Sequence, residues 1–162
     1  MIGPGFNWLG LIALCYLLGS TPSAYIAGRL LRGIDIREMG DGNAGAANVR
    51  PALGMRAAIA VGVADVGKGA AAVGLANGLM GPGAPTLAAG FAAVAGHNWP
   101  VFLHFRGGRG AATAYGALLA LLPMAVVPLS LAALLPLILT RSTTVALSIV
   151  FAPLWLVAWF IG

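Results

Sequence analysis

Charged side chains are scarce in this sequence. Its 162 residues include nine Lys or Arg and four Asp or Glu, which together make 8% of the chain. A soluble domain carries about 25% charged residues, so this composition cannot cover a water-exposed surface. Hydrophobic residues make up 60% of the chain, and the mean hydropathy is +0.95. The composition therefore predicts a protein whose main solvent is the lipid bilayer.

Cysteine is nearly absent as well. The single Cys15 lies in an apolar stretch, which excludes a disulfide within the chain and a metal site built on cysteine. The formal net charge is +5, but no soluble basic surface accompanies it, so no nucleic-acid partner is expected. The first apolar segment lacks the basic start of a signal peptide and is interpreted as a retained span.

Long uncharged stretches predict the membrane spans, since about 20 apolar residues are needed to cross roughly 30 Å of hydrocarbon. We expect spans at residues 6–27, 57–80, 84–103 and 145–161, with two short helices hinged near Pro123 inside 111–140. The predicted fold is therefore all-α, a single polytopic membrane domain over residues 1–162. It has about six transmembrane helices, with five as the alternative.

The basic residues mark one side of the membrane. They fall in three loops that six spans would place together: Arg29, Arg32, Arg37, Arg50 and Arg56 in the first, Arg106 and Arg109 in the second, and Arg141 in the third. The alternate loops carry no charge. By the positive-inside rule, the face that the charged loops share is expected to be cytoplasmic.

Two glycine-rich segments carry the candidate chemistry. Gly40, Gly42 and Gly45 form a G-x-G-x-x-G pattern, whose backbone N–H groups can turn toward an anion. No strand precedes it, so a dinucleotide fold is not indicated. The second segment places Arg106 and Arg109 around glycines, which suits phosphate oxygens. Anchoring to lipid headgroups is the alternative.

Three polar residues within the apolar spans, Asp65, Lys68 and His97, also require an explanation. Asp65 and Lys68 lie three residues apart on one helix face, where a structural ion pair and a substrate contact are both open. His97 ends the third span, as a helix-end hydrogen-bonding group or as a catalytic group. Neither His97 nor His104 has an acid five residues on, which excludes the H-x-x-x-x-D signature of other acyltransferases.

Several blocks of sequence together carry a family resemblance. These are Gly19-Ser-Thr-Pro-Ser-Ala-Tyr-Ile-Ala-Gly-Arg29, Gly33-Ile-Asp-Ile-Arg37, Gly40-x-Gly-Asn-x-Gly-Ala-x-Asn48-Val, Asp65-x-x-Lys-Gly69, Gly96-His-x-x-Pro-Val-Phe-Leu103 and Arg106-Gly-Gly-Arg-Gly110. In this order and spacing the chain resembles the bacterial acyl-phosphate:glycerol-3-phosphate acyltransferases, the PlsY family. The resemblance implies a seven-helix, multi-pass enzyme of phospholipid biosynthesis in the bacterial inner membrane. It also implies that the enzyme needs no acyl-CoA, cofactor or metal.

The implied reaction moves a fatty acyl group from acyl phosphate to the sn-1 hydroxyl of glycerol 3-phosphate, giving lysophosphatidic acid. Acyl phosphate, glycerol 3-phosphate and membrane lipids are the expected partners. The glycerol phosphate is expected at Gly40, Gly42, Asn43 and Gly45, and the donor phosphate at Arg106, Gly107, Gly108 and Arg109. The candidate catalytic residues are Arg109, Asn48, Lys68 and His97, with Asp65 orienting Lys68.

The chain also departs from the family pattern. Asp41 stands where Ser is usual, and a carboxylate there is unfavourable for an incoming phosphate unless it points away or meets a cation. Ala47 replaces Thr, Pro51 takes the place of an Arg, and Arg109 that of a Lys. Family members continue into a seventh span and a basic tail with His-x-x-Asn and a Glu, whereas the present sequence stops at Gly162, before either. A non-catalytic lipid-phosphate-binding membrane protein, or a fragment lacking the C-terminal catalytic segment, is the alternative.

Overall fold

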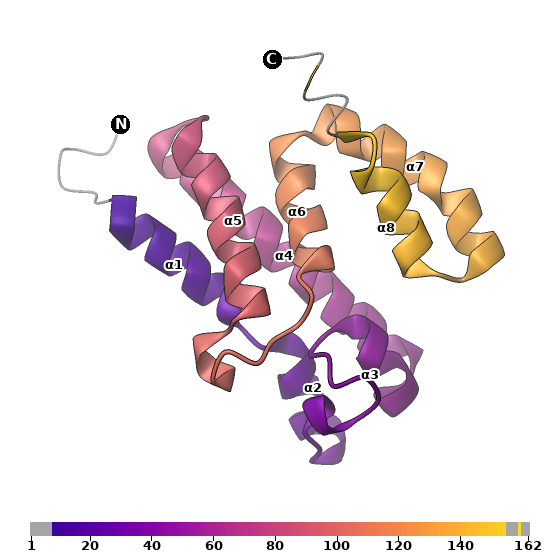
Figure 1. Ribbon diagram of the computed structural model, residues 1–162. Helices are drawn as coiled ribbons and strands as arrows, with labels where there is room; N and C mark the ends of the chain where they lie inside the picture. The colour runs from indigo at the N-terminus through magenta and orange to yellow at the C-terminus, as the bar shows by residue number, and fades with distance from the viewer. Residues whose placement is uncertain (1–7, 155–158, 160–162) are drawn as a thin grey trace. The chain divides into compact units, whose positions relative to one another are not determined.

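The computed structural model describes residues 8–154 and Trp159, and the regular elements in this part of the chain are all helices (Figure 1). This confirms the predicted all-α class. The chain divides into two compact units, Met1–Ala117 and Leu118–Gly162. The single domain over residues 1–162 stays a prediction.

The first predicted span is a broken helix. Helix α1 covers Trp8–Ser20 and α2 covers Ser23–Arg32. Pro22 stands directly before α2, where its missing N–H costs nothing because the first turn of a helix has no use for that donor. Gly33 ends α2 in the left-handed region, at φ +68°. The helical stretch thus runs past the predicted end at residue 27, and residues 6 and 7 lie outside the described residues.

Short helices and turns connect the spans at one end of the first unit. The 3-10 helix η1 (Ile36–Glu38) is followed by α3 (Ala46–Leu53), and Gly54 alone separates α3 from α4 (Met55–Met80). Helix α5 covers Ala84–Asn98. The prediction of one span over 84–103 was wrong at its end, because α5 stops at Asn98. Pro100 disfavours helical conformation in the residue before it. After Pro100 the chain forms the 3-10 helix η2 (Val101–Leu103).

Small residues let the helices of the first unit pack closely. Helix α1 contacts α4 and α5, while α3 contacts α2 and α4. The core among α1, α4 and α5 consists mostly of alanine, with members Leu11, Cys15, Ala72, Ala76, Ala89, Ala92 and Ala93. A Cβ added to Gly19 or Gly96 would clash with the backbone of the facing helix. Close approach through small residues is typical of helices in membranes, where apolar lipid removes the usual hydrophobic drive.

The charge-free stretch 111–140 folds as two helices, as predicted. Helix α6 (Ala111–Leu121) ends before α7 (Pro123–Thr140), so the break lies at Pro123. In the second unit, α8 (Thr143–Phe151) packs against α7. The predicted span 145–161 therefore begins two residues earlier, and most of its second half lies outside the described residues.

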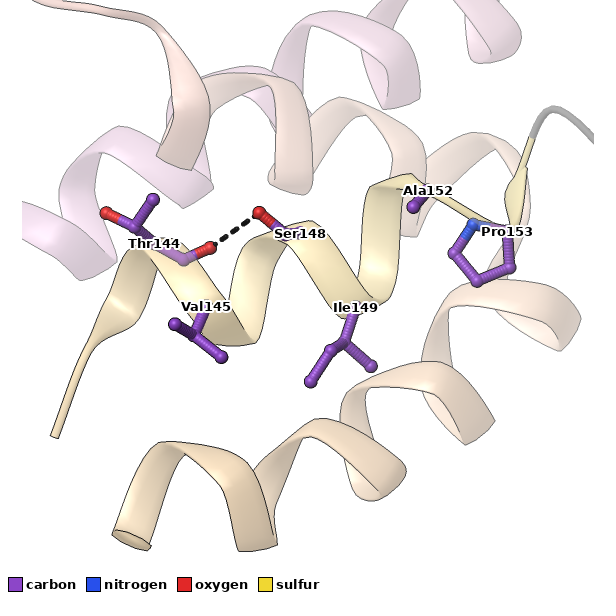
Figure 2. Close-up of a pocket in the computed structure, with 6 residues that line it drawn as sticks. All are labelled: Thr144, Val145, Ser148, Ile149, Ala152 and Pro153. Atoms are coloured by element: carbon purple, nitrogen blue, oxygen red, sulfur yellow. Dashed lines mark hydrogen bonds between the residues drawn. The ribbon is translucent and has the colours of Figure 1, made fainter. Parts of the chain in front are cut away.

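An open apolar groove of about 470 Å³ runs along α8 in the second unit (Figure 2). It is lined by Thr144, Val145, Ser148, Ile149, Ala152 and Pro153. Ser148 donates its hydroxyl to the carbonyl oxygen of Thr144 at 2.9 Å, so this polar group is satisfied within the helix. The groove therefore offers apolar surface and no charged group.

Among the described residues, three helical stretches are long and apolar enough to cross a bilayer: Trp8–Arg32, Met55–Met80 and Pro123–Thr140. Ala111–Leu121 is a shorter apolar helix. Large hydrophobic side chains such as Leu30, Phe91 and Ile138 are exposed on these and neighbouring helices, as expected where lipid is the solvent. The total of six spans stays a prediction.

Candidate anion-binding site

Asn48 shapes the first glycine-rich loop from the inside. This side chain on α3 is buried, and its amide nitrogen donates to the carbonyl oxygens of Ile36, Met39 and Asn43 at 2.9, 2.9 and 3.0 Å. Gly40 has φ +55°, and a Cβ added to it would clash with Oδ1 of Asn48. The loop thus wraps tightly around Asn48, and the amide is occupied by backbone carbonyls.

Arg37 connects the first loop to the segment after α5. Its guanidinium donates to Asp35 through Nε at 3.0 Å and Nη2 at 2.6 Å, and to the carbonyl oxygen of Leu103 through Nη1 at 3.1 Å. Asp35 also accepts from the Arg37 backbone N–H. These bonds to Arg37 lower the pKa of the Asp35 carboxyl from 3.8 to about 2, so it is ionised at neutral pH.

The second glycine-rich loop folds back on the end of α5. Gly107 and Gly108 donate their N–H groups to the carbonyl oxygens of Asn98 and His97 at 3.2 and 3.1 Å. Added Cβ atoms would clash with His97, with its carbonyl oxygen at Gly107 and with Nε2 at Gly108. Glycine is therefore required at position 107, where the clash is with backbone, whereas a side chain at position 108 would have to displace the His97 ring.

The two glycine-rich loops meet. Gly108 lies so close to the carbonyl oxygen of Ala44 that an added Cβ would be 3.1 Å from it. Arg109 Nη2 forms an ion pair with Asp41 Oδ2 at 2.9 Å, with the two side chains 75% and 47% exposed. The other oxygen of Asp41, Oδ1, accepts from the backbone N–H of Asn43 at 3.2 Å. The two loops are therefore in contact at two points, Ala44 with Gly108 and Asp41 with Arg109.

Arg106 is placed differently from Arg109. Its side chain is exposed, and this side chain forms no ion pair or hydrogen bond within the described part of the chain. Only its backbone N–H is engaged, with the carbonyl oxygen of Leu103 at 3.2 Å. The loop thus presents one guanidinium held by a carboxylate and a second that extends into solvent.

A buried polar cluster lies where α2, α4 and α5 converge. Lys68 Nζ contacts Asp65 Oδ1 at 3.0 Å and donates to the carbonyl oxygen of Thr21 at 3.1 Å. Ser23 donates its hydroxyl to the same Asp65 oxygen, and His97 Nδ1 lies 3.6 Å from it. The cluster thus joins both sides of the break between α1 and α2 to α4 and to the end of α5.

This cluster is connected to the second loop through His97. A small cavity of about 10 Å³, room for about one water molecule, is lined in part by Thr21, Ser23, Ala44, Lys68, His97 and Gly107. The buried cluster therefore lies directly beneath the place where the two loops meet.

The cluster contains Ser, His and Asp, but their hydrogen bonds do not follow the order of a catalytic triad. A triad needs the serine hydroxyl on the histidine, with the aspartate on its other nitrogen. Here Ser23 and His97 both face the same oxygen of Asp65. Groups of three or more His, Cys, Asp or Glu able to hold a metal are also not found in the described part of the chain. The arrangement favours anion binding by the exposed guanidiniums over nucleophilic catalysis.

The structure brings together most of the residues that the sequence singled out. Asn43, Gly45, Gly108 and Arg109 lie along the meeting loops, and Lys68 and His97 lie beneath them. Three contacts were missed: the bridge from Arg37 to Leu103, the Ser23–Asp65 hydrogen bond, and the pairing of Asp41 with Arg109. The last had a signal, because a carboxylate in an anion-binding loop needs a nearby cation.

Comparisons with known proteins agree on one family. The family model described as glycerol-3-phosphate acyltransferase matches residues 9–162. "Glycerol-3-phosphate acyltransferase 1" of Dehalococcoides mccartyi is 44% identical over 151 residues, which cover 90% of this chain and 73% of that protein. The glycerol-3-phosphate acyltransferase of Gloeobacter violaceus is 52% identical over 120 residues, which cover 70% of this chain and only 58% of the relative.

A solved structure agrees with the sequence relatives. The crystal structure of PlsY, an integral membrane glycerol 3-phosphate acyltransferase, in its glycerol 3-phosphate form matches with a TM-score of 0.85 and 33% identity. The match covers 96% of this chain and 78% of that one. The lysophosphatidic acid form matches with a TM-score of 0.82. On its sequence, its fold and the family model that spans it, this chain belongs to the glycerol-3-phosphate acyltransferase family.

Proposed function

We propose that this chain transfers a fatty acyl group from acyl phosphate to the sn-1 hydroxyl of glycerol 3-phosphate, giving lysophosphatidic acid for phospholipid synthesis. The observation that carries the proposal is the meeting of two glycine-rich loops at the Asp41–Arg109 contact of 2.9 Å. Two phosphorylated molecules have to be held side by side in this reaction, and two adjacent anion-binding loops suit that task.

The chemistry needs little beyond binding. Acyl phosphate is a mixed anhydride and is already activated, so no covalent enzyme nucleophile is required. The glycerol oxygen bonds to the acyl carbon, while the acyl–oxygen bond to phosphate breaks and phosphate leaves with its electron pair. The proton of the glycerol hydroxyl passes to the departing phosphate. Donors that stabilise negative charge on the leaving phosphate and on the acyl oxygen would lower the barrier.

In this proposal each loop holds one phosphate. The first loop, with Gly40, Gly42, Asn43 and Gly45, binds glycerol 3-phosphate. The second loop, Arg106 to Arg109 with Gly107 and Gly108 between them, binds the donor phosphate. The support is geometric: the loops contact each other at Ala44 and Gly108, and both arginine side chains are exposed and reachable from solvent. The apolar spans would receive the acyl chain.

Asn48, Lys68 and His97 act as positioning residues in the same proposal. The Asn48 amide nitrogen donates to three backbone carbonyl oxygens, and the Lys68 ammonium contacts Asp65 and the carbonyl oxygen of Thr21. His97 accepts the Gly108 N–H at its carbonyl oxygen. Asn48 and His97 thus each support the shape of one loop, and Lys68 holds the break between α1 and α2 beneath them. In this proposal, direct phosphate contact is left to the arginines and to the backbone of the first loop.

The proposed location is the bacterial inner membrane, with both loops in the cytoplasm. The loops carry Arg37, Arg106 and Arg109, whereas the turn between α4 and α5 has no charge. Lys and Arg concentrate on the cytoplasmic side of membrane proteins. Glycerol 3-phosphate is a charged, water-soluble metabolite, so a site open to the cytoplasm would reach it directly.

The experiment is a transfer assay on membranes from cells that express the chain. Membranes receive acyl phosphate and labelled glycerol 3-phosphate, and lysophosphatidate is quantified against membranes with the empty vector. Product above the vector level supports the enzyme. Phosphate-dependent stabilisation of the protein without turnover would instead favour a non-catalytic lipid-phosphate binder.

Arginine variants test the loops within the same assay. Arg109→Ala and Arg106→Ala are expected to lower kcat/KM about tenfold or more, since a hydrogen bond to a charged group contributes about 1.5–3 kcal/mol. Arg32→Ala is the matched control, because Arg32 is also exposed and ends α2, outside both glycine-rich loops. Equal losses from all three would reduce the loop arginines to lipid anchors.

A further inference from the structure

The Asp41 carboxylate accepts hydrogen bonds from donors in both glycine-rich loops. One of its oxygens accepts from the backbone N–H of Asn43 at 3.2 Å, and the other from the Arg109 guanidinium at 2.9 Å. A backbone N–H in a glycine loop and an arginine fork are the donors that bind phosphate oxygens in proteins. Asp41 therefore makes the contacts that an anion would make at this place.

The backbone presents Asp41 for this position. Gly40 and Gly42 on either side have φ +55° and +73°, the left-handed region that favours glycine. Gly42 donates its N–H to the Met39 carbonyl at 3.0 Å, which closes the turn. The turn carries Asp41 at its tip, and its exposed side chain reaches across to the second loop.

We infer that Asp41 is an internal ligand of the anion site, and that a substrate phosphate has to displace it from Arg109. This inference rests on the proposed function, because it takes the two loops to be the place where substrate phosphate binds. Asp41 then sets the affinity for phosphate without taking part in the chemical step.

The geometry makes this displacement feasible. Both side chains are well exposed, and exposed ion pairs shift an equilibrium by only about fivefold or less. Repulsion between a carboxylate and a phosphate about 4 Å apart in water contributes a further factor of about five. Removing the Asp41 charge should therefore tighten phosphate binding by about five- to twentyfold.

The test measures the binding of inorganic phosphate and of glycerol 3-phosphate to the purified full chain in detergent, by calorimetric titration. Asp41→Asn keeps the size of the side chain and removes its charge. Its dissociation constant for phosphate should fall by fivefold or more. Because Asp41 contacts a donor from each loop, the KM values for acyl phosphate and for glycerol 3-phosphate should fall in parallel, with kcat within about twofold of the starting value.

Glu38→Gln is the matched control. Glu38 is an exposed carboxylate three residues earlier, so its loss changes the net charge of the loop by the same amount without touching Arg109. Phosphate binding by Glu38→Gln should stay near the starting value. Equal tightening by both variants would mean a general charge effect and would overturn the inference.

A second part of the test makes the same Asp41→Asn change in an Arg109→Ala background. With Arg109 absent, Asp41→Asn should tighten phosphate binding much less, since the displaced contact no longer exists. The inference fails if Asp41→Asn leaves binding unchanged or weakens it, or if it lowers kcat tenfold, which would make Asp41 a catalytic base. Tighter phosphate binding with no lysophosphatidate from any variant would keep the internal ligand and reject the proposed enzyme. If product forms but Asp41→Asn does not change phosphate binding, the proposed enzyme is supported and the internal ligand is rejected.

Discussion

Lys68 and Asp65 show what a single polar residue does inside this protein. Both are buried on α4, and their 3.0 Å contact is extended by bonds to the Thr21 carbonyl and the Ser23 hydroxyl. A charged group at such depth is tolerated when it is paired and hydrogen-bonded. The pair also holds the break between α1 and α2, which places the cluster beneath the loops.

Removing one partner of this pair should be costly. Lys68→Met leaves Asp65 without its lysine, and we expect the free energy of unfolding to drop by about 3–5 kcal/mol. The double variant Asp65→Asn with Lys68→Met should recover part of that loss, because no unpaired charge remains. Denaturant unfolding in detergent measures both.

Arg56→Met is the control for Lys68→Met, since Arg56 is exposed at the start of the same helix. Its effect on stability should stay within about 0.5 kcal/mol. A Lys68→Met protein as stable as the unaltered chain would contradict the structural role of the pair. A loss of kcat at unchanged stability would point instead to direct contact with substrate.

At the scale of elements, glycines decide how closely the helices pack. Gly96 of α5 faces the backbone of α1, where an added Cβ would lie 2.8 Å from the Ser20 backbone nitrogen and would also clash with the Tyr16 carbonyl oxygen. Backbone atoms cannot move aside as a side-chain tip can. The contact between α1 and α5 therefore requires glycine at this position.

The expected cost is measurable by thermal unfolding in detergent. Gly96→Ala should destabilise the protein by about 1–3 kcal/mol through overpacking. Gly74→Ala is the matched control, because Gly74 lies within α4 and an added Cβ there has open space. Alanine is the better helix former, so Gly74→Ala should be neutral or slightly stabilising. Equal destabilisation by Gly96→Ala and Gly74→Ala would contradict the close backbone contact between α1 and α5 at Gly96.

At the scale of the whole molecule, the distribution of charge predicts orientation. The segment from η1 to α3 and the second glycine-rich loop carry arginines, while the turn between α4 and α5 carries none. Cys15, the single cysteine, is buried, so exposed cysteines can be introduced one at a time after Cys15→Ala.

Labelling with a membrane-impermeant maleimide should distinguish the two faces. In intact inner-membrane preparations of right-side-out orientation, Pro82→Cys should react and Glu38→Cys should react only after permeabilisation. Both positions are exposed and lie outside the long helices. Labelling of Glu38→Cys before permeabilisation would reverse the proposed topology.

Much of the fold and of the site follows from the chain of residues alone. The lack of charge requires a bilayer as solvent, the glycine and arginine blocks indicate the family, and Pro123 marks a helix break that the structure confirms. These features are local or compositional, so they can be read without knowing which segments touch. The number of spans and the single domain stay predictions.

Tertiary structure decided the rest, because it depends on which distant segments pack together. Folding of the first unit brings Asp41 onto Arg109 across 68 positions of sequence, and Arg37 onto Leu103 across 66. It also turns the Asn48 amide nitrogen inward onto three carbonyl oxygens, so the first glycine-rich loop is shaped around this side chain. The catalytic role of Asn48 stays a prediction. Composition and spacing specify which groups are available; only packing determines which of them are already occupied.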